Sequence, residues 1–331
     1  MDNISAGRKN NVGMLKPLLT LWITSLVASC PQLLAQQDPC DVPVVVSRFV
    51  TSSRTVELVK DLTAKDLTVR VGSVASTIES ASVDRGGKRV VLILDASRKI
   101  SKDEWHLEAE MANSLSKHAR PQDRFAFFLV GVDSPAGPLL SPGDAQKRVR
   151  EVASSRPDAA DGSERIYDAL LVAAKRLDPP EFGDAIFLFG HPEDSGSKAT
   201  PEQVQELILK NGLRFYAMSF TDPLRGKLPP GFDLNKPLPA NVGQEQADKI
   251  SHSTGYFFSF HSVGALKMPG QTALVKGFLR DLYAGIAEPY RLKINAKVTD
   301  KTALDLVVTN GEARNIRQSD VHYPHFIYRC R

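Results

Sequence analysis

Asp95 and Ser97 are the first residues along the chain whose types and position could do chemistry. They follow residues 90–94, a continuous apolar run that leaves no face for water and therefore predicts a buried strand. Such strands belong to parallel sheets, in which ligands bind at the carboxyl ends of the strands. We expect the acid and the hydroxyl to lie at such an edge, where they could bind a cation or a polar partner. The alternative is an ordinary Asx turn after a strand.

His191 and Glu193 follow a later apolar run, residues 185–189, which we also predict to be a buried strand. With Asp95 they could converge at the strand ends as acid and base, so a hydrolase-like enzyme stays an alternative. Other catalytic signals are absent from the sequence, which has no phosphate-binding glycine loop, no Gly-x-Ser-x-Gly motif and no Cys-x-x-Cys pair. We therefore expect no enzymatic activity.

The seven histidines show no spacing typical of a zinc site. His322 and His325 are three residues apart, which would place them on opposite faces of a strand. We interpret His252 and His261, which flank the last strand of the central region, as packing or surface residues. These four histidines are therefore not expected to form a site.

Strand and helix patterns alternate from residue 88 to residue 287. Apolar runs predict strands at residues 90–94, 125–130, 185–189, 213–220 and 256–260. Apolar periodicity and capping residues predict helices at residues 101–118, 144–153, 161–178, 200–212, 244–251 and 271–287. This alternation predicts a parallel sheet with right-handed crossovers, and hence a doubly wound, Rossmann-like α/β domain at residues 88–287.

Residues 36–87 and residues 288–331, which flank this domain, are rich in β-branched residues with a period of two. We predict an N-terminal β module at residues 36–87 and C-terminal strands at residues 288–331 that complete it. The result would be a small β-sandwich-like module with the α/β domain inserted. The long connection at residues 221–243 carries five prolines and leaves the carboxyl end of a predicted strand. Long loops of this kind are usually functional.

Residues 1–35 have the features of a bacterial signal peptide, with basic residues ahead of an apolar segment too short to span a bilayer. Met14 could be the true start instead of Met1. We favour cleavage near Ala35, and the alternative is a lipobox that ends in Cys30 and would attach a lipid there. The sequence therefore predicts a periplasmic or secreted protein, which would be a lipoprotein if Cys30 carries a lipid.

The mature chain carries a weak charge and two cysteines. Removal of residues 1–35 takes away three basic residues and one acid, so the formal net charge falls from +4 to +2, which argues against a nucleic-acid binder. An exported protein meets an oxidising compartment, so Cys40 and Cys330 could form a disulfide. The alternative is two free thiols.

Several motifs, in their order along the chain, resemble those of the von Willebrand factor A (VWA) domain. The Asp95-x-Ser97 sequence comes at the end of the central strand. Two further motifs come later in the chain: Asp123-Arg124-Phe125-Ala126-Phe127 and Ile166-Tyr167-Asp168-Ala169-Leu170. Residues 62–69, followed by Ile78-Glu79-Ser80, resemble the segment that leads into this domain in the bacterial exported "VWFA-related" group. The resemblance spans about residues 44–330. It implies a VWA-like α/β domain that binds other proteins.

The resemblance also implies a metal-ion-dependent adhesion site. In that family an Asp-x-Ser-x-Ser loop, a threonine and an aspartate hold Mg²⁺ and leave one position for an acidic partner group. Asp95 and Ser97 match the first two positions, but Lys99 stands at the third. The threonine position falls on Glu164, or on Ser163 if the loop shifts by one, and the aspartate position falls on Gly190 or His191.

A lysine near a divalent cation would repel it by several kcal/mol at an effective dielectric constant near 20. We therefore expect a degenerate site without a metal, in which Lys99 or Arg98 supplies positive charge to Asp95. If Mg²⁺ or Mn²⁺ does bind, Asp95 and Ser97 are the expected ligands, with Glu164, Glu193 and Asp194 as substitutes in an altered geometry.

The sequence as a whole predicts an exported protein that binds an unidentified protein partner. The expected contact face holds Asp95, Ser97, Lys99, Ser163, Glu164, His191, Glu193, Asp194 and the loop at residues 221–243. The alternatives are a metal-dependent adhesion protein with altered ligands and a hydrolase-like enzyme. Nothing in the sequence predicts a bound nucleic acid or a membrane contact other than the signal peptide or a lipid on Cys30.

Overall fold

The structure is a computed structural model that describes residues 39–50, 55–97, 100–131, 137–154, 164–191, 194–221, 242–254, 258–262, 266, 269–298 and 300–328. Several residues singled out from the sequence lie outside these ranges: Cys30, Arg98, Lys99, Ser163, Glu193, Cys330, the signal peptide and residues 222–241 of the long connection. Among the described residues no helix is long and apolar enough to cross a membrane.

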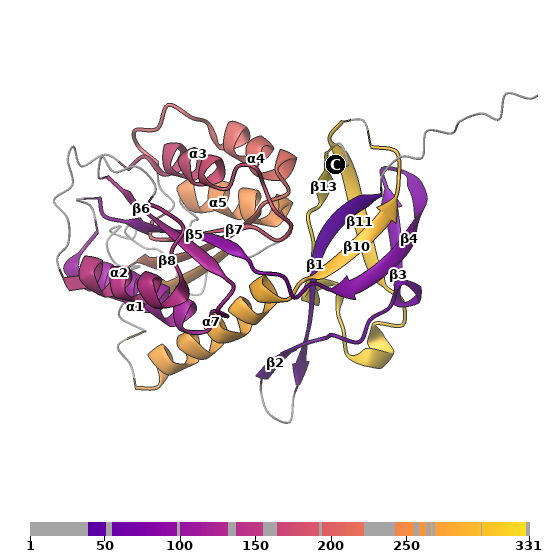
Figure 1. Ribbon diagram of the computed structural model, residues 1–331, viewed down its shortest axis with the longest axis horizontal. Coiled ribbons are helices and arrows are strands. Elements are labelled where there is room, and N and C mark those ends of the chain that lie inside the picture. The colour runs from indigo at the N-terminus through magenta and orange to yellow at the C-terminus, as the bar shows by residue number, and fades with distance from the viewer. Residues whose placement is uncertain are drawn as a thin grey trace, which may run out of the picture. The chain divides into compact units, whose positions relative to one another are not determined.

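A five-stranded parallel sheet forms the centre of the chain (Figure 1). Its strand order is β6-β5-β7-β8-β9, and every neighbouring pair is parallel. The strands are β5 (Arg89–Asp95), β6 (Arg124–Val130), β7 (Ala185–Phe189), β8 (Arg214–Thr221) and β9 (Phe258–Ser262). The predicted doubly wound α/β fold is confirmed, because strands follow helices in the order that the alternation requires.

Helices cover both faces of this sheet, which explains why β5 is apolar throughout. On one face, Val90, Leu92 and Leu94 belong to a core shared with α1 (Lys102–Lys117), α2 (Pro142–Ser154) and α7 (Gln271–Ala287). On the other face, Val91 and Ile93 belong to a core shared with α3 (Ile166–Arg176), α4 (Pro201–Lys210) and α5 (Val242–Ser253). Successive side chains of a strand point to opposite faces of the sheet. A strand in a sheet that is covered on both faces therefore has no position for a polar side chain.

The two ends of the chain form one antiparallel sheet, with the α/β domain inserted between them as predicted. The strand order is β12-β1-β10-β4-β3-β11-β13, and β2 pairs with β1. The strands are β1 (Cys40–Val50), β2 (Thr55–Leu58), β3 (Leu67–Val71), β4 (Val74–Val83), β10 (Tyr290–Asn295), β11 (Thr302–Val308), β12 (Val321–His322) and β13 (Phe326–Ile327). Short 3-10 helices lie at Ala64–Asp66, Glu312–Arg314 and Gln318–Asp320. The sheet curls around a core of its own, to which both chain ends contribute.

A buried polar network lies where the chain enters the α/β domain. The carboxylate of Asp123 accepts hydrogen bonds from the backbone N–H groups of Lys88 (2.9 Å) and Arg120 (2.8 Å). The Tyr283 hydroxyl, from α7, donates to the same carboxylate at 2.7 Å. Hydrogen bonds from Arg120 and Tyr283 hold the pKa of Asp123 below its usual value despite burial. Asp123, part of a motif that supported the family resemblance, is therefore a structural residue that joins three segments.

Candidate functional site

Asp95 ends β5 at the carboxyl edge of the sheet, as predicted, and its side chain is fully buried. Its N–H donates to Oε2 of Glu108, on α1, at 3.0 Å. Its Oδ1 accepts from the N–H of Ser97 at 2.8 Å, which closes the turn after the strand. Burial raises the pKa of Asp95, while hydrogen bonds from Ser97 and the charge of His191 oppose the increase. The site therefore begins with a carboxylate that is costly to keep charged.

His191 follows β7 and lies between two buried carboxylates. Its Nδ1 is 3.8 Å from Oδ2 of Asp95, and its Nε2 is 3.8 Å from Oε1 of Glu104, on α1. The histidine side chain is 13% exposed, so it links the two acids to the surface. Within the described residues Oδ2 of Asp95 and Nδ1 of His191 are buried and have no hydrogen-bond partner. The imidazole thus lies between the two carboxylates, with one ring nitrogen towards each.

Glycine at position 190 allows His191 to reach this place. The backbone of Gly190 has a φ of +137°, and a Cβ there would lie 2.4 Å from the Cβ of Asp95. An aspartate at position 190 is thus sterically excluded. Of the two positions at which the resemblance would place a third-loop acid, only His191 can carry a side chain.

Glu164 and Asp194 connect the loops beside the site. The backbone oxygen of Glu164, a buried residue, accepts from the N–H groups of Ser195 (3.0 Å) and Gly196 (3.1 Å). The carboxylate of Asp194 accepts from the N–H of Tyr167, in the first turn of α3, at 3.0 Å, and from that of Ser197 at 2.9 Å. Asp194 therefore stabilises the start of α3. Of the site residues predicted from the sequence, Ser97 and His191 are the described ones that meet Asp95.

Sequence reasoning missed two members of the site, Glu104 and Glu108. The capping box predicted from the sequence is present: the N–H of Glu104 donates to the hydroxyl of Ser101 at 3.2 Å, and the Glu104 carboxylate accepts from the N–H of Ser101. The same carboxylate faces His191. The two glutamates are four residues apart and share one helix face, which is buried at both positions. That spacing, beside apolar neighbours, was the available signal.

The described residues do not fit a Mg²⁺ site. Mg²⁺ requires oxygen ligands in a tight octahedron, and here an imidazole nitrogen stands where the adhesion site of the resembled family needs an acid. Among the described residues no group of three or more His, Cys, Asp and Glu side chains is arranged to hold a metal ion. What the arrangement offers is a buried acid, a hydroxyl and an imidazole at a strand edge.

Comparisons with known proteins give structural likeness only: no family model and no curated protein sequence matches the chain. One similar solved structure is an aerotolerance-related membrane protein from Bacteroides fragilis, with 14% identity and a TM-score of 0.45 over 60% of this chain and 99% of that chain. Another is the conserved hypothetical protein BatB from Bacteroides thetaiotaomicron, with 14% identity and a TM-score of 0.42 over 59% and 99%. A von Willebrand factor type A protein from Catenulispora acidiphila has 10% identity and a TM-score of 0.44 over 83% and 71%. At these values the likenesses decide neither family nor function.

Proposed function

We propose that this chain is an exported protein whose α/β domain binds a protein partner at the carboxyl edge of its sheet, without catalysis and without a metal ion. The position of His191 between Asp95 and Glu104 carries the proposal. The His191 side chain faces these two acids at the edge where a divalent cation faces the acids of the resembled adhesion site. The α/β domain then retains the binding edge and replaces the metal with a side chain of its own.

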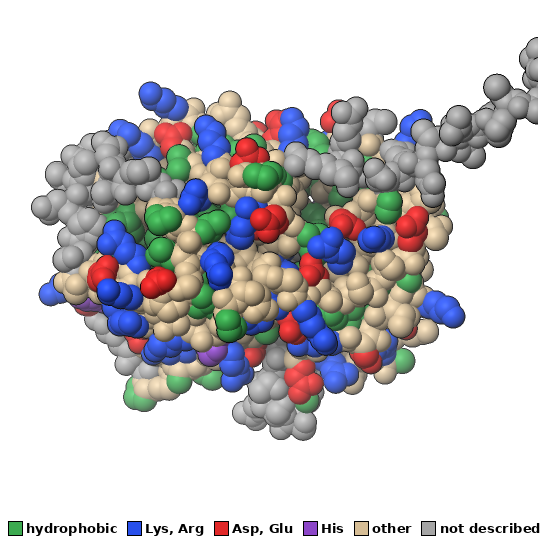
Figure 2. Space-filling view, in the orientation of Figure 1, with side chains coloured by type: hydrophobic (Ala, Val, Ile, Leu, Met, Phe, Trp, Pro, Cys, Tyr) green, Lys and Arg blue, Asp and Glu red, His purple; other side chains and the backbone are tan. Residues whose placement is uncertain are grey.

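The distribution of charged side chains on the surface favours a protein partner over a nucleic acid. On the face drawn in Figure 2, Lys and Arg side chains lie interspersed with Asp and Glu instead of gathering into one basic surface. A nucleic-acid interface would require a clustered basic face. The small formal charge of the whole chain, +4, agrees with this reading.

A calorimetric titration with Mg²⁺ and with Mn²⁺ tests metal independence. We expect no heat of binding and no metal-dependent increase in the melting temperature of residues 36–331. The matched variant is His191→Asp, which places an acid where the resemblance implies one and should gain metal binding if the histidine is what excludes it. Metal binding by the unsubstituted protein that is lost in Asp95→Asn would refute the proposal and favour a metal-dependent adhesion protein.

Binding at this edge is tested with the same substitutions. The mature protein is used as bait against cell-envelope proteins, and any captured partner is purified and its affinity measured by calorimetry. His191→Ala should weaken the affinity at least tenfold, since it removes the side chain that lies between both carboxylates and reaches the surface. Glu79→Ala is the control, because Glu79 is an exposed residue of β4 on the other sheet. Equal losses in the two variants would contradict binding at the Asp95 edge.

Export is part of the same proposal and has its own test. Cleavage near Ala35 should give a mature protein in the periplasm or the medium, with a mass that identifies the new N-terminus. Substitution Cys30→Ser should leave the location unchanged if the segment is a simple signal peptide. Retention of unsubstituted protein in the membrane, with release by Cys30→Ser, would establish the lipid anchor instead.

A further inference from the structure

Two histidines meet where the C-terminal segment, residues 323–328, contacts helix α5. The rings of His252, in the last turn of α5, and His325 have centroids 4.4 Å apart and lie edge to face at 85°. The N–H of His325 donates to the backbone oxygen of Ser253 at 2.9 Å, and its ring is 5.1 Å from that of Tyr323. No sequence pattern predicts this pair, because the two residues are 73 positions apart.

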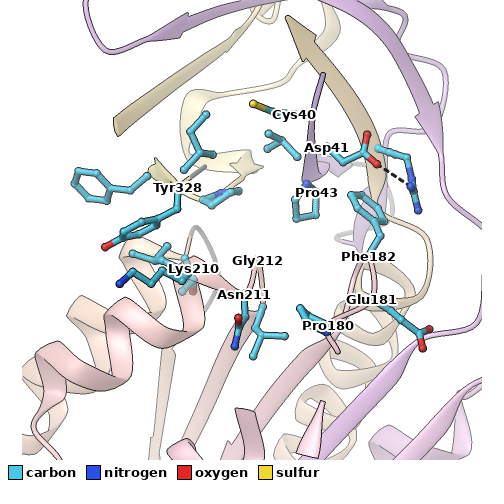
Figure 3. A pocket seen from close by; sticks show the side chains of 18 residues that line it. Cys40, Asp41, Pro43, Pro180, Glu181, Phe182, Lys210, Asn211, Gly212 and Tyr328 are labelled. Atoms are coloured by element: carbon cyan, nitrogen blue, oxygen red, sulfur yellow. Dashed lines mark hydrogen bonds and ion pairs between the residues drawn. The ribbon is translucent and has the colours of Figure 1, made fainter. Parts of the chain in front are cut away.

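The same segment forms one wall of a cavity between the antiparallel sheet and residues of α4 and nearby loops, with a volume of about 340 Å³ (Figure 3). Pro324, Phe326 and Tyr328 line this wall, Lys210 lies beside Tyr328, and Phe182 lies across the cavity from them. The amine of Lys210 lies 5.7 Å from the centre of the Tyr328 ring. The segment therefore contacts α5 at His325, pairs with β11 at Phe326 and Ile327, and lines this cavity.

We propose that His252 and His325 form a pH-sensitive contact that holds the C-terminal segment on helix α5 at neutral pH and releases it on acidification. Two neutral imidazoles pack edge to face without penalty. Two imidazolium ions at the same separation repel each other, and the negative end of the α5 dipole can favour only part of that charge. The contact is thus stable in one protonation state and strained in the other.

The surroundings of His325 lower its pKa while the segment is docked. Burial lowers the pKa of His325, and the charges of His252 and His322 lower it further, whereas the carboxylate of Asp305 opposes them. Burial also lowers the pKa of His322, against the opposing charge of Asp320. A histidine whose pKa is lower in the docked state than in the released state, where it is about 6.5, favours docking above that pH. As the pH falls below 6.5, docking weakens.

Hydrogen exchange of the C-terminal segment tests the proposal. Protection factors for the amides of residue 323 and residues 325–328, corrected for intrinsic exchange rates, are compared at pH 7.5 and pH 5.5. The uptake of one proton per opening predicts that protection falls by up to about tenfold per pH unit below 6.5. His252→Gln should reduce this pH dependence without abolishing it, because burial still lowers the pKa of His325. The variant should fold normally, because His252 is an exposed residue.

His106→Gln is the matched control, since His106 is an exposed histidine of α1 that lies outside this contact. It should retain the pH dependence of the unsubstituted protein. His325→Gln is a second variant for the same comparison of protection at the two pH values. Its folding at pH 7.5 is checked by circular dichroism. Equal protection at the two pH values in the unsubstituted protein, or an unchanged pH dependence in His252→Gln, would overturn the proposal.

Discussion

The substitution Gly190→Ala tests whether the close approach of two loops builds the candidate site. A Cβ at position 190 would lie 2.4 Å from the Cβ of Asp95, a separation that no packed pair of carbon atoms tolerates. The backbone φ of +137° is in addition a conformation that residues other than glycine rarely adopt. Alanine must therefore push Asp95 away and adopt a strained conformation at the same time.

The magnitude follows from these two costs. Backbone strain of this kind costs about 1–3 kcal/mol, and overpacking a buried contact costs about another 1–3 kcal/mol. We expect a loss of about 3–5 kcal/mol in the free energy of unfolding, or roughly 10 °C in melting temperature. The control is Gly212→Ala, which also has a positive φ (+61°) but would meet no atom within 4 Å, so it should cost only about 1 kcal/mol.

Denaturant unfolding followed by circular dichroism measures both variants under one set of conditions. If the loss in Gly190→Ala does not exceed that in Gly212→Ala, the loops are not packed as described and the argument that His191 replaces a third-loop acid fails. A larger loss in Gly190→Ala, together with weaker partner binding, would tie the geometry of the site to its function.

Three further predictions concern single residues. Asp123→Ala should cost about 3–5 kcal/mol of unfolding free energy, because it leaves buried donors without an acceptor, whereas Tyr283→Phe should cost about 1 kcal/mol. Asp95→Asn should raise the unfolding free energy at pH 7 by about 1 kcal/mol. Because burial raises the pKa of Asp95 in the native state, the native unsubstituted protein takes up a proton at a higher pH than the unfolded chain does. The stability gain of Asp95→Asn should therefore shrink as the pH falls towards 4. A gain that does not change with pH would contradict this prediction. Cys40 lines the same cavity as Tyr328, and Tyr328 is two residues before Cys330 in the sequence. If the predicted disulfide forms between Cys40 and Cys330, a reductant should lower the melting temperature of the unsubstituted protein. The same reductant should leave the melting temperature of Cys40→Ser unchanged.

Most of the fold could be predicted because it depends on local patterns. The unbroken apolar run of β5 indicates burial on two faces, and Ser101 and Thr200 each accept the hydrogen bond expected of a helix N-cap. Element ends were less certain: α5 begins two residues earlier than predicted (242 against 244) and β9 two residues later (258 against 256). Sequence patterns near loops do not resolve such differences, because tertiary contacts fix where an element ends.

The candidate site shows the limit of the same reasoning. Asp95 and Ser97 were located correctly, since a residue that ends a central strand must lie at the carboxyl edge. The roles of Glu104 and Glu108 depend on how α1 lies against β7 and β5, and the structural role of Asp194 depends on its distance from the start of α3. No periodicity encodes these contacts.

The sequence by itself thus determined the class of fold, the insertion of the α/β domain between two β segments and the strand that carries the site. Only the tertiary structure decided that His191 lies between two buried acids, that position 190 has no room for a side chain and that His252 meets His325. The physical reason is that hydrophobic patterning acts along each element, whereas the chemistry of a site depends on distances of a few ångströms between side chains that the chain brings together from far apart.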